Sequence, residues 1–327
     1  MTWLKRPSSR EGKNEFEIPA IPDGVLQVCH PDWRGVRTAA YAFRDPVIES
    51  SDLKRLSAHA EDLVDAGVAT VVIQGWPRNA AQFALAMASL DVRVLTVFHS
   101  SPAQHGVDPG EADAVRDMLV LHKDGIVDQI ATVKAGVAAS FSSLGHNIVH
   151  VGNRIPILEP VEPATVAEGT NVGIFLYPMW RKNVTTQILA AHKLGWRSFV
   201  MDEPDVGYIS RNDLTICGEL PRDEFLPVQA AMDITLNVTL SECHPMQPME
   251  SYLLGVPCLM SRTSDLFVDD PDLWDLTTVD QADNPDAIAT ATERLLSHRD
   301  EAVERAASAL QRMDEVSKAQ WLSFTRP

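Results

Sequence analysis

Short runs of β-branched and other apolar residues alternate along the chain with stretches whose apolar positions recur every three or four residues. This alternation predicts βα units arranged around parallel sheets. In the first half we expect strands over 25–29, 68–74 and 92–98 and helices over 52–66 and 80–90, with less clear segments at 126–133, 135–141 and 148–151. In the second half we expect strands over 172–177, 198–201, 214–217, 234–240 and 257–260, and helices over 185–194, 225–232, 249–254, 288–296 and 302 to about 321.

The two halves are separated by 155–163, which holds three prolines in nine residues and should be an extended, stiff connection. The sequence therefore predicts two α/β domains of similar size. We expect a flexible tail over 1–23, an N-terminal Rossmann-like domain over 24–155, a C-terminal Rossmann-like domain over 156–300 and a final helical segment over 301–327.

Composition narrows the class of protein without identifying it. The 327 residues are 45% hydrophobic and 22% charged, as in soluble globular proteins, and their apolar runs are too short to span a membrane. The polar start and four scattered cysteines without a C-x-x-C pair favour a cytoplasmic protein with no disulfide framework or zinc site. The formal net charge of −17 disfavours nonspecific attraction to nucleic acid or anionic lipid, although a local basic cleft stays compatible with it.

Two carboxylates bracket one loop in the second half. Glu242 follows the strand expected over 234–240, and Glu250 is expected in the first turn of the next helix, with Pro248 at the first helical position. Ligands of open α/β sheets bind beyond the carboxyl ends of the strands, where these acids could accept hydrogen bonds from sugar hydroxyls. The N–H groups of Met246 and Gln247 could receive phosphate oxygens. The simpler interpretation is an ordinary loop acid and a carboxylate that favours the helix start.

Three further side chains follow expected strands. Arg181 and Lys182 lie between the strand over 172–177 and the helix from 185, where two cations can neutralise a diphosphate or simply be solvated. His99 ends the strand over 92–98, and a lone histidine is more often structural than functional.

The spacing of the two acids resembles the E-x7-E motif of the GT4-like retaining glycosyltransferases. The segment 251–257, which ends in Gly-Val-Pro, is similar to the family's helix after the second Glu, and 218–221 and 232–241 occupy the places of its other conserved segments. The resemblance implies a GT-B fold, in which two Rossmann-like domains face each other across a cleft. It also implies roles: Glu250 would accept the nucleotide ribose hydroxyls and Glu242 would hold the donor sugar.

The same resemblance implies that Arg181 and Lys182 stabilise the leaving diphosphate and that His99 lies near the sugar or the reaction centre. The family often carries a Gly-Gly loop after the first strand, close to the donor phosphates. Here 33–38 keeps only Gly35, and Arg34 or Arg37 could supply charge in its place. The D-x-D at 270–272 lacks a matching strand and is interpreted as surface.

The resemblance thus predicts transfer of a hexose or pentose from a nucleoside diphosphate sugar to a hydroxyl, with retained configuration. It implies no cofactor and no metal, a UDP-sugar as the first choice of donor and a GDP-sugar as the second. The acceptor class stays open between a glycan, a lipid, a small molecule and a modified nucleic acid base, as does the oligomeric state. Two alternatives remain: a degenerate GT-B module that binds a nucleotide sugar without turnover, and a GT-B epimerase.

Overall fold

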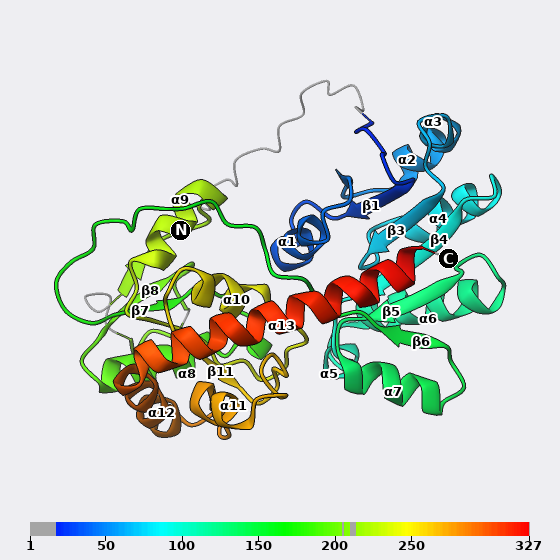
Figure 1. The fold of residues 1–327 in the computed structure, drawn as a ribbon. Helices are drawn as coiled ribbons and strands as arrows, with labels where there is room; N and C mark the ends of the chain where they lie inside the picture. The colour runs from blue at the N-terminus through cyan, green and yellow to red at the C-terminus, as the bar shows by residue number, and fades with distance from the viewer. Residues whose placement is uncertain (1–17, 205, 210–213, 327) are drawn as a thin grey trace.

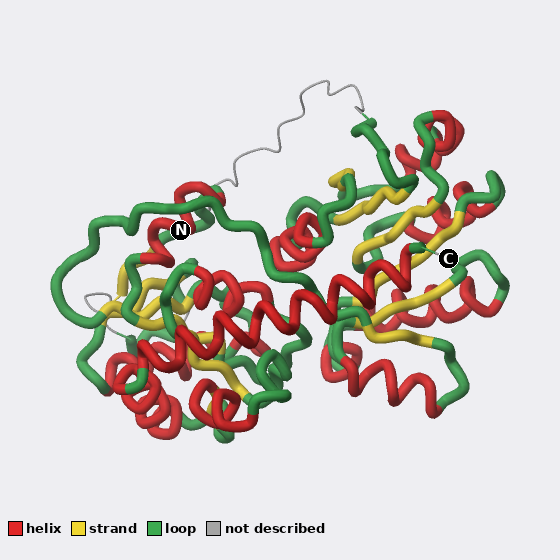
Figure 2. The backbone as a smooth tube through the Cα atoms, in the orientation of Figure 1, coloured by secondary structure: helices red, strands yellow, loops and turns green. Residues whose placement is uncertain are grey.

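The computed structural model describes residues 18–204, 206–209 and 214–326, and the tail expected over 1–23 lies mostly outside them. It contains two six-stranded sheets in which every paired strand is parallel, each flanked by helices (Figures 1 and 2). The expected α/β class is confirmed. No helix among the described residues is both long and apolar enough to cross a membrane.

The first sheet has the strand order β2-β1-β3-β4-β5-β6. Its strands are β1 (Val25–Cys29), β2 (Val47–Glu49), β3 (Thr70–Gln74), β4 (Arg93–Phe98), β5 (Gln129–Thr132) and β6 (Ile148–His150). Its helices are α1 (Arg34–Ala42), α2 (Lys54–Ala58), α3 (Ala60–Asp65), α4 (Ala80–Ala88), α5 (Pro102–His105), α6 (Pro109–Lys123) and α7 (Ala135–Ser143). The central strands β1 and β3 are buried along their whole length, although each carries a glutamine among its apolar residues.

The second sheet has the order β12-β11-β10-β7-β8-β9. Its strands are β7 (Asn171–Ile174), β8 (Arg197–Val200), β9 (Leu214–Ile216), β10 (Ile234–Asn237), β11 (Cys258–Ser261) and β12 (Thr278–Val279). Its helices are the 3₁₀ turn η1 (Trp180–Lys182), α8 (Val184–Lys193), α9 (Arg222–Ala230), α10 (Met246–Leu253), α11 (Pro271–Thr277), α12 (Pro285–Ser297) and α13 (Arg299–Thr325). Adjacent pairing of β7 and β10 brings the loops that follow them together.

Several elements of the first half differ from those expected. The helix expected over 52–66 is broken at His59, whose φ of −112° and ψ of 22° leave the helical range, so that α2 and α3 are separate. The helix α2 begins after Leu53, and the Asp52 carboxylate accepts a hydrogen bond from the Lys54 N–H of its first turn. The sequence pattern also missed α6, in which Met118 alone is buried and the apolar face is therefore weak.

The proline-rich connection is extended, without helix or strand, and runs along the second domain (Figure 2). The Ala164 N–H donates to the carbonyl of Pro227 in α9, and Leu158 and Val166 pack against the cluster around Phe225. This contact fixes the connection to the outside of α9.

The last helix, α13, starts beside α12 and ends against the first sheet (Figure 1). Its Trp321 stacks on Phe43 with ring centroids 3.9 Å apart and donates from Nε1 to Asp45. Midway along the helix, Asp314 forms a buried two-point ion pair with Arg154, at 2.6 and 3.0 Å. One helix therefore ties the two domains and the start of their connection together.

Candidate functional site

The carboxyl ends of both sheets meet at the boundary between the domains. Ser101 follows β4 of the first sheet and Ser241 follows β10 of the second, and their hydroxyl oxygens lie 2.5 Å apart. Both side chains are buried. The edges at which α/β sheets bind ligands thus face each other, and the expected site residues can be located against that boundary.

Glu242 and Lys182 form an ion pair at this boundary. The Lys182 Nζ lies 2.6 Å from Glu242 Oε2, and both side chains are largely buried, at 17% and 11% exposure. Burial alone would raise the pKa of Glu242, but the ammonium of Lys182, with a smaller contribution from Arg181, holds that pKa below its ordinary value. The carboxylate is therefore ionised at neutral pH and fixed toward the η1 loop.

The η1 loop that carries the two cations is held by Asn183. This residue adopts a left-handed conformation, with φ of 54°, and its amide donates to the carbonyls of Val238 and Ala282. The Leu240 N–H donates to the Arg181 carbonyl. These contacts fix the loop after β7 against the loop after β10, which places Lys182 beside Glu242.

Glu250 does not share the Lys182–Glu242 pair. Its Oε1 lies 2.6 Å from Nη1 of Arg222, the first residue of α9, and the Glu250 side chain is 7% exposed. Burial raises the pKa of Glu250, and the guanidinium groups of Arg222 and Arg34 oppose the rise only in part. Sequence reasoning missed Arg222, although it directly follows the segment 218–221 that carried part of the resemblance.

The expected position of Glu250 in its helix is wrong. The helix α10 starts at Met246, with Pro245 before it, so Glu250 lies in the second turn. The orphan N–H groups of the helix start are therefore those of Met246 and Gln247, as Pro248 has none. The side-chain oxygen of Gln247, Oε1, accepts a hydrogen bond from the Asn237 side chain of β10 at 2.9 Å.

The prediction of a loop over 33–38 is also wrong, because α1 starts at Arg34. The Arg37 N–H already donates to the Trp33 carbonyl, which closes the first helical turn. Gly35 is exposed in that turn, and a Cβ added there would contact nothing within 4 Å. No close approach by its own neighbours requires this glycine.

Arg34 nevertheless reaches the second domain. Its guanidinium lies 5.1 Å from the centroid of the Phe225 ring and 3.7 Å from the Met201 sulfur, and its charge lowers the pKa of Glu250 against the effect of burial. An arginine of the first domain therefore lies beside the acid of the second, where charge was expected in place of a glycine loop.

The first domain also holds the loop that carries Glu242. Lys134, which follows β5, donates from Nζ to the carbonyls of Glu242 at 3.1 Å and Thr263 at 2.5 Å. Asn153 donates from its backbone N–H to Nδ1 of His244 and from its side chain to the His244 carbonyl, both at 2.8 Å. Lys134 had no signal in the sequence, because it acts through backbone carbonyls of a distant segment.

The two histidines near the site, His99 and His244, are neutral. Burial lowers the pKa of His99 to about 4, and its Nε2 lies 2.7 Å from Oε1 of Gln74, at the end of β3. Burial, together with His150, His99 and Lys134, lowers the pKa of His244 to about 3. Both imidazoles are therefore uncharged at neutral pH.

The D-x-D at 270–272 has a structural role. Asp270 caps α11 by accepting from the Leu273 N–H and forms an ion pair with Arg305 of α13 at 2.5 Å. Throughout the described residues, no three or more His, Cys, Asp or Glu side chains gather as metal ligands would.

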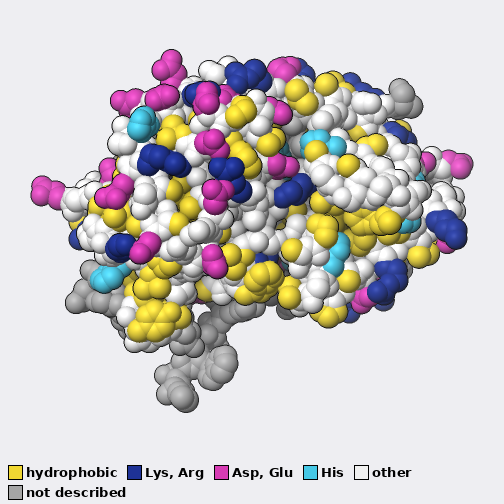
Figure 3. Space-filling view, turned by 90° about the horizontal axis from the view of Figure 1, so that it is seen from below, with side chains coloured by type: hydrophobic (Ala, Val, Ile, Leu, Met, Phe, Trp, Pro, Cys, Tyr) yellow, Lys and Arg dark blue, Asp and Glu magenta, His cyan; other side chains and the backbone are white. Residues whose placement is uncertain are grey.

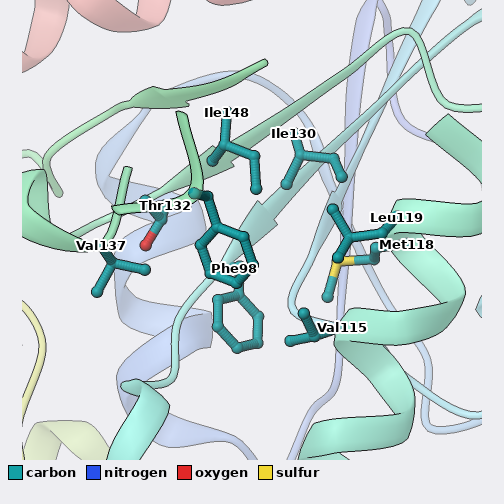
Figure 4. A pocket seen from close by; sticks show the side chains of 9 residues that line it. Phe98, Val115, Met118, Leu119, Ile130, Thr132, Val137 and Ile148 are labelled. Atoms are coloured by element: carbon teal, nitrogen blue, oxygen red, sulfur yellow. The ribbon is translucent and has the colours of Figure 1, made fainter. Parts of the chain in front are cut away.

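A small apolar pocket lies in the first domain, separate from these charged residues. Figure 3 shows apolar side chains gathered in a hollow on the half of the molecule that contains α5 to α7. Figure 4 shows the pocket lining, which comes from β4 to β6, α6 and α7: Phe98, Val115, Met118, Leu119, Ile130, Thr132, Val137, Phe141 and Ile148. Because Thr132 is the one polar side chain among them, this pocket offers no partner for a diphosphate.

No protein-family model matches the sequence, and no curated protein matches it. Solved structures do match. A UDP-forming α,α-trehalose-phosphate synthase from Burkholderia xenovorans is 12% identical over 84% of this chain and 78% of its own, with a TM-score of 0.59. The apo structure of OtsA is 10% identical over 93% and 99%, with a TM-score of 0.62. The catalytic domain of starch synthase IV from Arabidopsis thaliana, bound to ADP and acarbose, is 15% identical over 85% and 78%, with a TM-score of 0.57.

These likenesses and the two parallel six-stranded sheets establish the fold. The chain is a two-domain α/β protein with the GT-B fold, as the sequence analysis expected.

Proposed function

We propose that this protein is a retaining glycosyltransferase of the GT4-like kind, which moves a sugar from a nucleoside diphosphate sugar to a hydroxyl acceptor. One observation carries the proposal. Two buried acids eight residues apart, Glu242 and Glu250, each pair with a cation of the second domain. From the first domain, Lys134 donates to the backbone carbonyl of Glu242, and the charge of Arg34 lowers the pKa of Glu250 against the effect of burial. This arrangement lies where the ligand edges of a GT-B fold face each other.

The donor would lie along the second domain. Glu250 would accept the two ribose hydroxyls, with Arg222 holding the carboxylate in place, and Glu242 would accept hydroxyls of the donor sugar. The diphosphate would lie between them, near Arg181, Lys182 and the N–H groups of Met246 and Gln247. Arg34 would supply a further positive charge from the first domain.

The reaction itself needs charge stabilisation. The leaving diphosphate gains negative charge as the bond to the sugar breaks, and the sugar carbon becomes positive. Lys182, which forms an ion pair with Glu242, would also form an ion pair with the diphosphate. We assign no side-chain nucleophile, and the resident cations neutralise the diphosphate without a metal ion in this proposal.

The similar proteins guide the choice of donor. The trehalose-phosphate synthase is described as UDP-forming and the starch synthase as bound to ADP. A UDP-sugar therefore stays the first donor to test, followed by GDP- and ADP-sugars. The acceptor class stays open between a glycan, a lipid, a small molecule and a modified nucleic acid base.

A second candidate is a GT-B module that binds a nucleotide sugar without turnover. It is favoured by one observation: helix α1 replaces the flexible glycine loop, and Arg34 already contacts the second domain. In that case the protein would bind donors tightly and release no nucleoside diphosphate.

The test is incubation of the protein with a panel of radiolabelled UDP-, GDP- and ADP-sugars, with and without pooled acceptors. Nucleoside diphosphate release and the anomeric configuration of the product are measured. We expect turnover that is lost in Lys182→Met and Glu250→Ala and kept in Lys193→Met, an exposed ion-paired lysine of α8. Binding without release would support the binding module, and an isomerised donor would support an epimerase. If the protein neither binds a donor nor releases a nucleoside diphosphate, the proposal is contradicted.

A further inference from the structure

A buried chain of hydrogen bonds runs through the first sheet to His99, and it begins at Gln27 in β1. The side chain of Gln27 is fully buried. Its Nε2 donates to the carbonyls of Ala40 at 2.9 Å and Asp45 at 3.3 Å. A carbonyl oxygen can only accept, so the two carbonyls fix the nitrogen end of this amide toward them and its oxygen end away.

The next amide is fixed by the first. Gln74 is fully buried at the end of β3, and its side chain meets Gln27 Oε1 at 2.7 Å. Because that oxygen is an acceptor, Gln74 must present its NH₂ group to it. The Oε1 of Gln74 is therefore turned the other way, toward His99.

The third hydrogen bond then determines which nitrogen of the His99 imidazole carries the proton. His99 Nε2 lies 2.7 Å from Gln74 Oε1, an acceptor, so this nitrogen must carry the proton. A neutral imidazole has one proton, which leaves a lone pair on Nδ1. The hydrogen bond that His99 makes within the described residues is through Nε2, and none there involves its Nδ1.

We propose that Gln27 and Gln74 are positioning residues that hold His99 in the Nε2–H tautomer, so that its Nδ1 accepts a hydrogen bond from a substrate hydroxyl. The tautomer follows from the ligand-free geometry alone. The second half rests on the proposed function and narrows it: the group that meets His99 is a hydroxyl rather than a phosphate or carboxylate oxygen.

The surroundings keep the imidazole in that state. Burial is the cause of the lowered pKa of His99, and the titratable neighbours toward the second domain are His244, itself neutral, and Lys134 beyond it. A protonated His99 would donate from both nitrogens and attract anions. The neutral tautomer repels an anionic oxygen at Nδ1 and accepts a hydroxyl proton there.

The test is ¹⁵N nuclear magnetic resonance of the histidine side chains in the ligand-free protein, with the His99 signals assigned by their loss in His99→Asn. We expect a single Nε2–H tautomer that does not titrate between pH 8 and 5. In Gln74→Met, the acceptor for Nε2–H is gone, and we expect averaged signals from two exchanging tautomers. In the double variant Gln27→Met with Gln74→Glu, a carboxylate faces the imidazole, and we expect protonation within that pH range.

The matched control is Thr96→Val, which removes a buried hydroxyl of β4 that does not belong to the chain of amides. It should leave the His99 signals unchanged. An Nδ1–H tautomer in the unaltered protein, titration above pH 5, or unchanged signals in Gln74→Met would overturn the assignment. These readouts need no turnover, so they stand apart from the test of the proposed function.

Activity measurements test the second part of the proposal, here called the substrate half: that Nδ1 of His99 accepts a hydrogen bond from a substrate hydroxyl. We expect Gln74→Met to lower kcat by about tenfold, the value of one hydrogen bond, while the Kd of UDP, which lacks the sugar that is transferred, is unchanged. A weakened Kd for UDP in Gln74→Met would indicate general damage to the fold, and unchanged kcat would remove the role for His99 Nδ1. Either result overturns the substrate half and leaves the tautomer to be judged by resonance alone.

Discussion

At the scale of single residues, the two acids of the site differ although each has a cation at 2.6 Å. The pKa of Glu242 is lowered because Lys182 outweighs burial, whereas the pKa of Glu250 is raised because burial outweighs Arg222. Falling pH therefore protonates Glu250 first. The two carboxyls can be separated by their titration as well as by mutation.

The first prediction is that Glu250 sets the acid limit of donor binding. As pH falls toward the raised pKa of Glu250, the carboxylate gains a proton and would lose the proposed charge-assisted bonds to ribose. The affinity for UDP should therefore drop with a midpoint above 4.5, the ordinary pKa. Glu250→Gln should bind UDP about 10- to 100-fold more weakly at pH 7, since hydrogen bonds to charged groups contribute about 1.5–3 kcal/mol. Its affinity should then be flat with pH. Titration calorimetry between pH 4.5 and 8 measures the affinity for UDP and its dependence on pH. If Glu250→Gln loses affinity at low pH as the unaltered protein does, the prediction is contradicted.

The second prediction concerns Lys182. The variant Lys182→Met leaves Glu242 buried without its cation, so the pKa of Glu242 should rise and the fold should lose about 3–5 kcal/mol, as when one partner of a buried pair is removed. The double variant Lys182→Met with Glu242→Gln removes the unpaired charge and should regain most of that stability without regaining activity. Chemical denaturation and sugar transfer measure the two effects. Equal stability of the single and double variants would show that the pair is not coupled.

At the scale of elements, loops rather than strands decide the site. The strands β1, β3 and β4 lie where their short runs of β-branched and other apolar residues predicted them, because a strand buried on both faces is mostly apolar in sequence. The helix α1 was not predicted, because 33–38 was expected to be a loop, and α10 starts at Met246 rather than at the expected 249. Prolines and glycines nearby allow more than one helix start, and contacts with the other domain select among them.

The third prediction concerns α13 and the pair Arg154–Asp314, whose side chains are 6% and 9% exposed. Asp314→Asn should cost about 3–5 kcal/mol of unfolding free energy, because it leaves a buried guanidinium without its carboxylate. Replacing both residues, as Arg154→Met with Asp314→Leu, should recover most of the loss. Urea denaturation followed by tryptophan fluorescence measures this, since Trp321 lies on the same helix. A double variant as unstable as the single one would contradict it.

At the scale of the whole molecule, the loop that carries Glu242 belongs to the second domain but is held by the first. Ser101, Lys134 and Asn153 all contact the segment from Ser241 to His244. Any motion that opens the two domains breaks these contacts together. The position of Glu242 is therefore coupled to domain closure.

The fourth prediction follows from that coupling. Lys134→Met should leave UDP affinity nearly unchanged, because the proposed donor contacts lie on the second domain. It should raise the ratio of donor hydrolysis to sugar transfer, because a looser closure admits water. The control is Lys123→Met, an exposed lysine at the end of α6. Measuring free and transferred sugar from a labelled donor gives the ratio. Equal ratios in Lys134→Met and the control would show that Lys134 does not govern closure.

The sequence alone determined the two α/β domains and placed Glu242 and Lys182 in loops that follow strands. Apolar periodicity and residues at strand ends are local signals, and parallel strands bring their carboxyl ends to one edge. Only the tertiary structure decided the partners that come from distant segments: Arg222 for Glu250, Lys134 for the Glu242 carbonyl, and Gln27 and Gln74 for His99. Such partners are selected by the packing of one domain on the other and by the need to satisfy every buried polar group, and neither leaves a periodic trace in the sequence.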